Sequence, residues 1–275
     1  MGARGELRDM KIKVISLNLW NGGRLLDRIS DFLIAEQPDL LFLQEAYAGR
    51  LPVQQAGDPA LAPRFRSVAI LTGLFPSYDF DFAPVYCDTR SLEGDIEEGQ
   101  LLLSKWPIIF RDNIFFDRPY AKLDQDATTD FSQWPATLQH CRIQIDNQVI
   151  ELLHVHGPVN FDGTLDSPRR LKMSQMILDR ISDKTPAIVA GDFNVQPQTQ
   201  TIRNIENHLT NVFKDELVTT FNMCQKTNPG YARAVVDMMF ISPTIKVLEH
   251  HQPQVDISDH WPLIATLEFS TSYNG

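Results

Sequence analysis

Short apolar runs alternate with periodic apolar stretches along this chain and predict a mixture of strands and helices. Apolar residues without interruption at 40–43 and 187–190 predict buried strands. Apolar positions that recur every three to four residues predict helices at 24–37, 66–74, 167–181 and 199–209. The other predicted strands are 11–20, 101–104, 149–155, 235–241 and 263–269. No repeat or linker interrupts this pattern, so we predict one domain at residues 10–270, with residues 1–9 as a flexible extension.

Two stretches, 46–98 and 111–135, show weaker periodicity. Proline and glycine punctuate the first, and the second mixes aspartates with aromatic residues. Long loops inside compact domains are usually either functional or disordered. We therefore predict that the second stretch shapes a pocket.

Several predicted strands end on side chains that carry oxygen or imidazole nitrogen. Asp192 and Asn194 follow the strand at 187–190, and residues i and i+2 of an extended segment point to the same side. Asp237 lies inside an apolar run, where a carboxylate needs a donor or cationic partner. The other such groups are Asn18, Glu45, His154, Asp259 and His260. Any one of them alone is explained as a turn former, a core residue or the first solvated residue after a strand.

Taken together, these groups are suited to metal-assisted chemistry. Carboxylates and carboxamides without thiolates favour a hard cation, Mg²⁺ or Mn²⁺, over zinc. Two histidines, one of which Asp237 is free to orient, supply acid, base and phosphate-contacting groups. This inventory predicts metal-assisted hydrolysis of a phosphoester.

The order of these motifs resembles the endonuclease/exonuclease/phosphatase superfamily over about residues 11–269. In chain order the motifs are Ile-Ser-Leu-Asn18, Leu-Gln-Glu45, Gly-Gln-Leu-Leu-Leu-Ser104, His154, Gly-Asp192-Phe-Asn194, Val-Val-Asp237 and Ser-Asp259-His260. The resemblance implies an α/β (α+β) fold, a four-layered sandwich. Two mainly antiparallel β-sheets would pack face to face with helices outside, and the active site would lie at one edge.

The resemblance also implies roles for single residues. Glu45 would be the principal metal ligand, assisted by Asn18 and Asp259. Asp192 would position or deprotonate the attacking water, and Asn194 would hold that water or a phosphate oxygen. His260, oriented by Asp237, would contact the scissile phosphate and stabilise charge in the transition state.

His154 occupies the place of the family's second histidine, which pairs with a glutamate in the deoxyribonuclease-like branch, and Glu98 is the matching glutamate here. Two features depart from the family pattern. The arginine that many members carry before this histidine has no equivalent at 133–136, and the family's Arg-x-x-Gln reads Lys172-Met-Ser-Gln175. Both departures weaken the expected grip on phosphate.

Composition narrows the class of protein. The chain has 275 residues, 43% of them hydrophobic, and its net charge of −10 disfavours a broad cationic surface for nucleic acid. Its 3 cysteines are too few and scattered for a disulfide scaffold or a zinc knuckle, so we expect buried or half-buried thiols. Without a long apolar run or an apolar leader, we expect a soluble cytoplasmic protein, and a monomer.

The substrate stays open at this point among nucleic acid, a phospholipid headgroup and a phosphorylated metabolite. A non-catalytic binding scaffold on the same fold is the alternative from another class of function. A structural calcium site would also use the acidic cluster, but it leaves the two histidines unexplained.

Overall fold

The structure is a computed structural model. It describes residues 6–49, 63–89, 95–124, 127–128, 130–160 and 165–273.

The first of two β-sheets has seven strands in the order β12-β13-β1-β2-β4-β3-β6. Their bounds are β12 Lys246–His251, β13 Leu263–Tyr273, β1 Glu6–Asn18, β2 Leu40–Gly49, β4 Ile96–Ser104, β3 Asp79–Asp88 and β6 Ala121–Leu123. Neighbouring strands run antiparallel except for the pairs β1–β2 and β3–β6.

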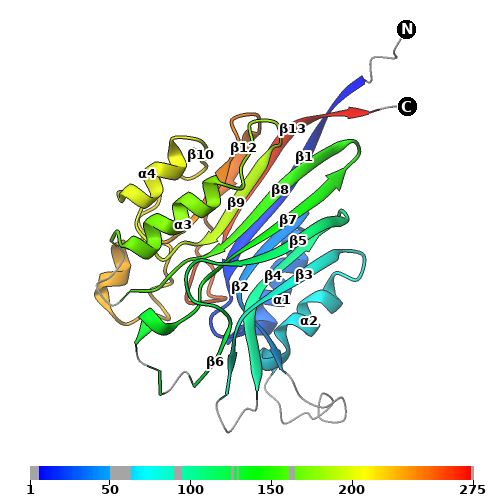
Figure 1. Ribbon diagram of the computed structural model, residues 1–275. Coiled ribbons are helices and arrows are strands. Elements are labelled where there is room, and N and C mark those ends of the chain that lie inside the picture. Colours follow the sequence, from blue (N-terminus) through cyan, green and yellow to red (C-terminus); the bar gives the residue numbers. More distant parts are fainter. Residues whose placement is uncertain are drawn as a thin grey trace.

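The second sheet has six strands in the order β10-β11-β9-β8-β7-β5. Their bounds are β10 Thr210–Asn211, β11 Asp237–Ile241, β9 Ala187–Asp192, β8 Gln148–His156, β7 Thr137–Ile145 and β5 Ile108–Phe115. All neighbours are antiparallel except β8 and β9. The two sheets lie face to face, with their strands running roughly in the same direction across the molecule (Figure 1).

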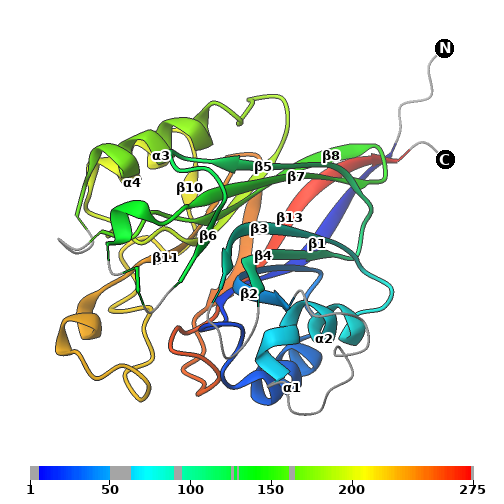
Figure 2. The same ribbon diagram turned by 60° about the horizontal axis from the view of Figure 1, so that its bottom comes forward.

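Helices cover the outer face of each sheet and complete the predicted four-layered sandwich (Figure 2). Helices α1 (Leu26–Glu36) and α2 (Ser67–Leu74) lie against the first sheet, and α3 (Pro168–Leu178) and α4 (Gln200–Glu206) lie against the second. Short 3-10 helices occur at Pro63–Arg66, Phe131–Gln133 and Pro229–Arg233.

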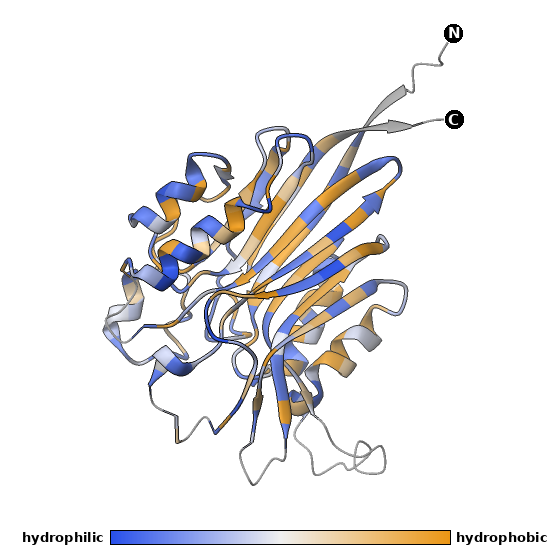
Figure 3. Cartoon of the chain, in the orientation of Figure 1, coloured by the Kyte–Doolittle hydropathy of each residue, from blue (hydrophilic) through white to orange (hydrophobic). Residues whose placement is uncertain are grey.

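Three apolar layers hold these four layers of structure together. One lies between the sheets and joins residues such as Phe42 and Ile188. The second packs α3 and α4 onto the second sheet, and the third packs α1 and α2 onto the first. Hydrophobic residues accordingly run along the strands, while the helices carry both kinds of residue (Figure 3). Strands β2 and β9 are in the middle of covered sheets, which explains why their apolar runs are uninterrupted.

The two stretches of weak periodicity contain more regular structure than the pattern predicts. They include β3, β6 and most of β5. Strands β7 and β12, which lie outside these stretches, were also not predicted. In β3, Asp79 pairs with Arg111 at 2.9 Å and Asp81 accepts from Gln139 at 2.7 Å, so polar residues are satisfied across strands. A register shift beside Pro84 further interrupts the alternation of β3. Strand β5 is an edge strand with exposed apolar side chains, which obscures its pattern.

The expected N-terminal extension differs from the structure where the two can be compared. Residues 1–5 lie outside the described part of the chain, whereas Glu6–Asp9 belong to β1 and pair with β13. Cys87 and Cys141 are buried thiols, but Cys224 is exposed rather than half-buried. Among the helices in the described ranges, none is long and apolar enough to cross a membrane.

Candidate active site

The polar groups predicted at strand ends meet at one end of the sandwich. β1, β2, β9 and β11 contribute side chains there, and the segment before β13 contributes two more. The predicted residues that lie together are Asn18, Glu45, Asp192, Asn194, Asp237, Asp259 and His260.

Glu45 is placed by an irregularity in β2. The register of β2 against β4 shifts between Leu43 and Ala46, and Glu45 has a left-handed backbone with φ of 57°. Its Oε1 accepts from Asn18 Nδ2 at 2.9 Å, and its Oε2 accepts from the backbone N–H of Asn21 at 2.6 Å. Burial opposes ionisation of Glu45, but nearby His156 and these hydrogen bonds outweigh it and lower its pKa. Glu45 is therefore held as a carboxylate.

Asp192 ends β9 directly after a glycine that the fold requires. Gly191 has φ of 144°, and a Cβ there would lie 2.0 Å from the carbonyl oxygen of Val155 on β8. The Asp192 carboxylate accepts from the backbone N–H of Asn194 at 2.8 Å and from Asn18 Nδ2 at 3.2 Å. Burial and the charge of Asp237 raise the pKa of Asp192 to about 6. A group with such a pKa is mainly ionised at neutral pH yet is a better base than an ordinary aspartate.

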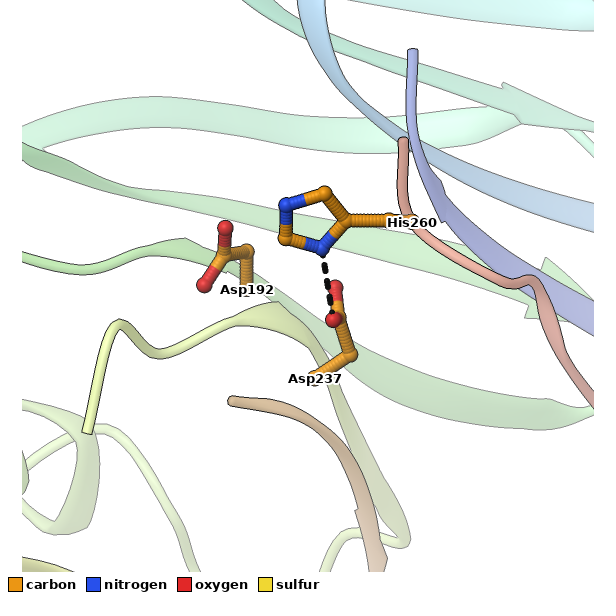
Figure 4. Close-up of side chains that lie close together, drawn as sticks. All are labelled: Asp192, Asp237 and His260. Atoms are coloured by element: carbon orange, nitrogen blue, oxygen red, sulfur yellow. Dashed lines mark hydrogen bonds and ion pairs between the residues drawn. The ribbon is translucent and has the colours of Figure 1, made fainter. Parts of the chain in front are cut away.

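Asp237 and His260 form a buried ion pair next to Asp192 (Figure 4). Asp237 is opposite Asp192 in the antiparallel pairing of β11 with β9, and His260 Nδ1 donates to Asp237 Oδ2 at 2.8 Å. Burial lowers the pKa of His260, but the charge and hydrogen bond of Asp237 outweigh burial and raise it to about 10. The imidazole is thus protonated at neutral pH.

Two sets of residues could hold a metal ion. Ligand atoms of Asp192, Asp237 and His260 lie within 4.8 Å of one another. However, an imidazole binds metal only when it is neutral, and His260 is protonated and bonded to Asp237. The Glu45 and Asn18 set, with only oxygen ligands, fits a hard divalent cation better.

Asp259 lies beside this second set but is already engaged. Its Oδ2 is 2.6 Å from Lys226 Nζ. Burial raises the pKa of Asp259, while His260 and Lys226 act in the opposite direction. Ser258 Oγ donates to the carbonyl oxygen of Asn18 at 2.7 Å, which ties this segment to β1.

Asn194 lies at the edge of the group with a left-handed backbone, φ 52°. Its Nδ2 donates to the carbonyl oxygen of Gly157 at 3.1 Å. A Cβ at Gly157 would meet the backbone of Phe193 at 2.2 Å, so glycine is needed for this close approach.

The structure does not bring His154 into the group, contrary to the role expected for it. His154 is fully buried between the sheets, where Nδ1 donates to Gln139 Oε1 at 2.8 Å and Nε2 accepts from Gln44 Nε2 at 2.6 Å. Burial lowers the pKa of His154 well below its ordinary value, so the ring is neutral. His156, two residues further along the same face of β8, is the histidine that lies opposite Asp192 and near Glu45.

Glu98 lies near the group, but His154 does not pair with it, since both ring nitrogens of His154 bind glutamines. It lines a hollow of about 120 Å³ together with Glu45, His156 and Trp134. Burial and the charge of Glu45 raise the pKa of Glu98 to about 8, against hydrogen bonds from two tyrosines. Trp134 belongs to the 111–135 stretch, which was predicted to shape a pocket.

Three groups in the site were not predicted from the sequence: the backbone N–H of Asn21, the His156 ring and the Lys226 ammonium. Only His156 had a visible signal. It shares a strand face with His154 and is nearer the strand end, where the other residues of the site lie. The other two depend on loop geometry.

Comparisons with known proteins identify the family of this chain. The sequence profile described as Endonuclease/Exonuclease/phosphatase family matches residues 15–260. Among curated protein sequences, no significant match was found.

Solved structures with the same fold have low sequence identity to this chain. An endonuclease/exonuclease/phosphatase from Beutenbergia cavernae DSM 12333 has a TM-score of 0.70 at 16% identity, covering 94% of this chain and 72% of its own. One from Bacteroides vulgatus has a TM-score of 0.68 at 17% identity, with 94% and 99% covered. D. rerio TDP2 in complex with single-strand DNA product has a TM-score of 0.64 at 17% identity, with 94% and 98% covered. With the profile match over most of its length, the chain belongs to the endonuclease/exonuclease/phosphatase family, whose members are generally phosphoester hydrolases.

Proposed function

We propose that this protein is a metal-dependent phosphoester hydrolase that uses Mg²⁺ or Mn²⁺. The observation that carries the proposal is the protonated His260 between Asp237 and Asp192, next to the ionised Glu45. A non-catalytic scaffold would have no need for a buried imidazolium beside carboxylates, because such groups are costly to bury.

Asp192 accepts a proton from the attacking water. Its raised pKa of about 6 matches this task near neutral pH. Asn194, whose backbone N–H holds the Asp192 carboxylate, keeps that carboxylate oriented toward the water.

His260 donates a hydrogen bond to a phosphate oxygen as negative charge develops there. Asp237 binds Nδ1, which leaves the Nε2 proton for the substrate. Such a donor stabilises the transition state more than the ground state, which is the condition for raising kcat.

Glu45 would hold the divalent ion, with Asn18 and Asp259 beside it. When bound, the ion supplies charge stabilisation to the oxygens around phosphorus. The substrate class stays open among nucleic acid, a phospholipid headgroup and a small phosphorylated metabolite. TDP2 with single-strand DNA supports the first, and the net charge of −10 disfavours long duplex DNA.

The test is hydrolysis of bis(p-nitrophenyl) phosphate with Mg²⁺, followed by a panel of DNA, RNA, sphingomyelin and inositol phosphates. We expect activity that EDTA abolishes and Mg²⁺ restores. Asp192→Asn is nearly isosteric and should lower kcat by about 10²–10⁴-fold with little change in KM. A folded wild-type protein that hydrolyses nothing in the panel would favour the scaffold, and a decrease of only a few-fold would assign Asp192 to structure.

A further inference from the structure

Lys226 brings a positive charge into the candidate site. Its Nζ is 2.6 Å from Asp259 Oδ2, and its side chain is 26% exposed whereas that of Asp259 is 4% exposed. Glu45 also acts electrostatically on Lys226. The ammonium group is therefore close to the carboxylates of the site, on a side chain that is partly exposed to solvent.

The backbone holds Lys226 in this place. The Lys226 N–H donates to the carbonyl oxygen of Asn222 at 3.0 Å, and the Asn222 N–H donates to the carbonyl oxygen of Asp259 at 2.8 Å. The Asn222 side chain donates to the carbonyl oxygen of Ser258 at 2.9 Å. The turn that carries Lys226 is thus bonded to the same segment that carries His260, which preorganises the two cations relative to each other.

Aromatic rings flank the lysine. Its Nζ is 5.5 Å from the centroid of the Phe221 ring and 5.2 Å from that of Tyr231. The Phe221 ring also contacts the His260 ring, with centroids 4.4 Å apart. Cation–π attraction stabilises an ammonium here without consuming its hydrogen-bond donors. An ammonium has three donors, so Lys226 can bind a second anion while it binds Asp259.

Lys226 offsets part of the negative charge of the site, as His260 and the proposed metal ion also do. The carboxylates of Glu45, Asp192, Asp237 and Asp259 would repel an anionic substrate.

We propose that Lys226 binds a non-bridging oxygen of the substrate phosphate, on the side of the site where His260 lies. This inference rests on the proposed function, because it assigns a substrate contact at the same site. The competing role is simple neutralisation of Asp259, in which Lys226 would make no contact with phosphate.

The two roles differ in what removal of the ammonium changes. A phosphate contact predicts that Lys226→Met weakens phosphate binding. Neutralisation alone predicts that phosphate binding is unchanged and that Mg²⁺ binds more tightly, since Asp259 becomes free to attract a cation.

The experiment is calorimetric titration of the full chain with inorganic phosphate in the presence of Mg²⁺, and with Mg²⁺ alone. We expect Lys226→Met to weaken phosphate binding about tenfold or more, and Lys226→Arg to retain most of it. Lys246→Met is the matched control, because Lys246, on β12, makes an exposed ion pair with Glu268 at 3.3 Å. It should leave phosphate affinity unchanged.

Unchanged phosphate affinity in a folded Lys226→Met protein would overturn the inference. If that variant does not fold, Lys226→Gln replaces it under the same criterion. Weakened phosphate binding together with a wild-type protein that hydrolyses no phosphoester would leave the role of Lys226 standing and refute the proposed hydrolase function instead.

Discussion

At the scale of single residues, the charge of His260 depends mainly on Asp237. Burial alone would favour the neutral imidazole, and the Asp237 carboxylate at 2.8 Å, with smaller contributions from Asp192 and Asp259, reverses this preference. The pKa of His260 is about 10 in the folded chain against an ordinary 6.5. The pair therefore stabilises the fold fully below pH 6.5, and this contribution is lost as the pH rises toward 10.

Asp237→Asn should move the alkaline limb of the pH–rate profile to lower pH. Removing this carboxylate removes the largest influence that raises the pKa of His260, so burial lowers it against only the weaker charges of Asp192 and Asp259. Activity then requires a lower pH to keep the imidazole protonated. The check is kcat/KM measured against pH for both proteins.

A double-mutant cycle gives an independent reading of the same pair. His260→Ala should cost about 100-fold or more in kcat/KM, and adding Asp237→Asn should cost little further, because residues that act as a unit are non-additive. Strictly additive losses with an unmoved alkaline limb would contradict the pair.

At the scale of elements, β8 and β9 place the site by close backbone contact. The parallel pairing sets His156 opposite Asp192, and Gly191 allows β9 to approach Val155. Strand β8 also carries His154, which is buried between two glutamines. One strand thus carries a structural and a site histidine two residues apart.

Gly191→Ala should destabilise the fold by at least about 2 kcal/mol, because it adds a Cβ 2.0 Å from a backbone oxygen at a φ of 144°. Gly73→Ala is the control, since nothing lies within 4 Å of a Cβ there and residue 73 is in α2. In a helix this change stabilises by about 0.5–1 kcal/mol. Urea unfolding measures both, and equal effects would contradict the steric argument.

His154 and His156 should separate stability from activity. His154→Leu leaves Gln44 and Gln139 without their buried partner, which costs about 1–3 kcal/mol for each unsatisfied group. His156→Ala should lower kcat/KM while the melting temperature changes little. Melting curves and kinetics of both variants provide the check. Loss of activity in a fully stable His154→Leu protein would place His154 in the chemistry after all.

At the scale of the whole molecule, the site draws on distant parts of the chain. Asn18 and Asp192 bond to each other across 174 positions of sequence. The carboxylates that meet there repel one another, so a bound divalent cation stabilises the folded state over the unfolded chain.

Mg²⁺ should therefore raise the melting temperature. At a concentration 100 times the Kd the stabilisation is about 2.7 kcal/mol. A gain of this size corresponds to several degrees for a chain of this length. Glu45→Gln, which removes the carboxylate proposed to bind the ion, should abolish the increase. NaCl of equal ionic strength controls for screening, and an equal response in Glu45→Gln would remove Glu45 from the metal site.

The local sequence pattern was sufficient to predict the elements in which burial alone determines the order of apolar and polar residues. The apolar runs of β2 and β9 and the apolar periodicity of α3 are local features, so they predicted these elements directly. Strands such as β3 and β5 were missed because their polar or exposed residues are satisfied by neighbours distant in sequence. Hydrophobic periodicity carries no information about such partners.

Most side chains of the candidate site could be predicted from the sequence, because strand ends and motif order are properties of the chain. Which of these groups come together depends on the packed sheets and loops. The tertiary structure placed His156 rather than His154 at the site, since two residues on one face of β8 differ only in depth between the sheets. It also brought Lys226 to Asp259 through loop backbone bonds that no local pattern encodes. Pairings over long sequence distances depend on sheet packing, and so they emerge only when the chain is folded.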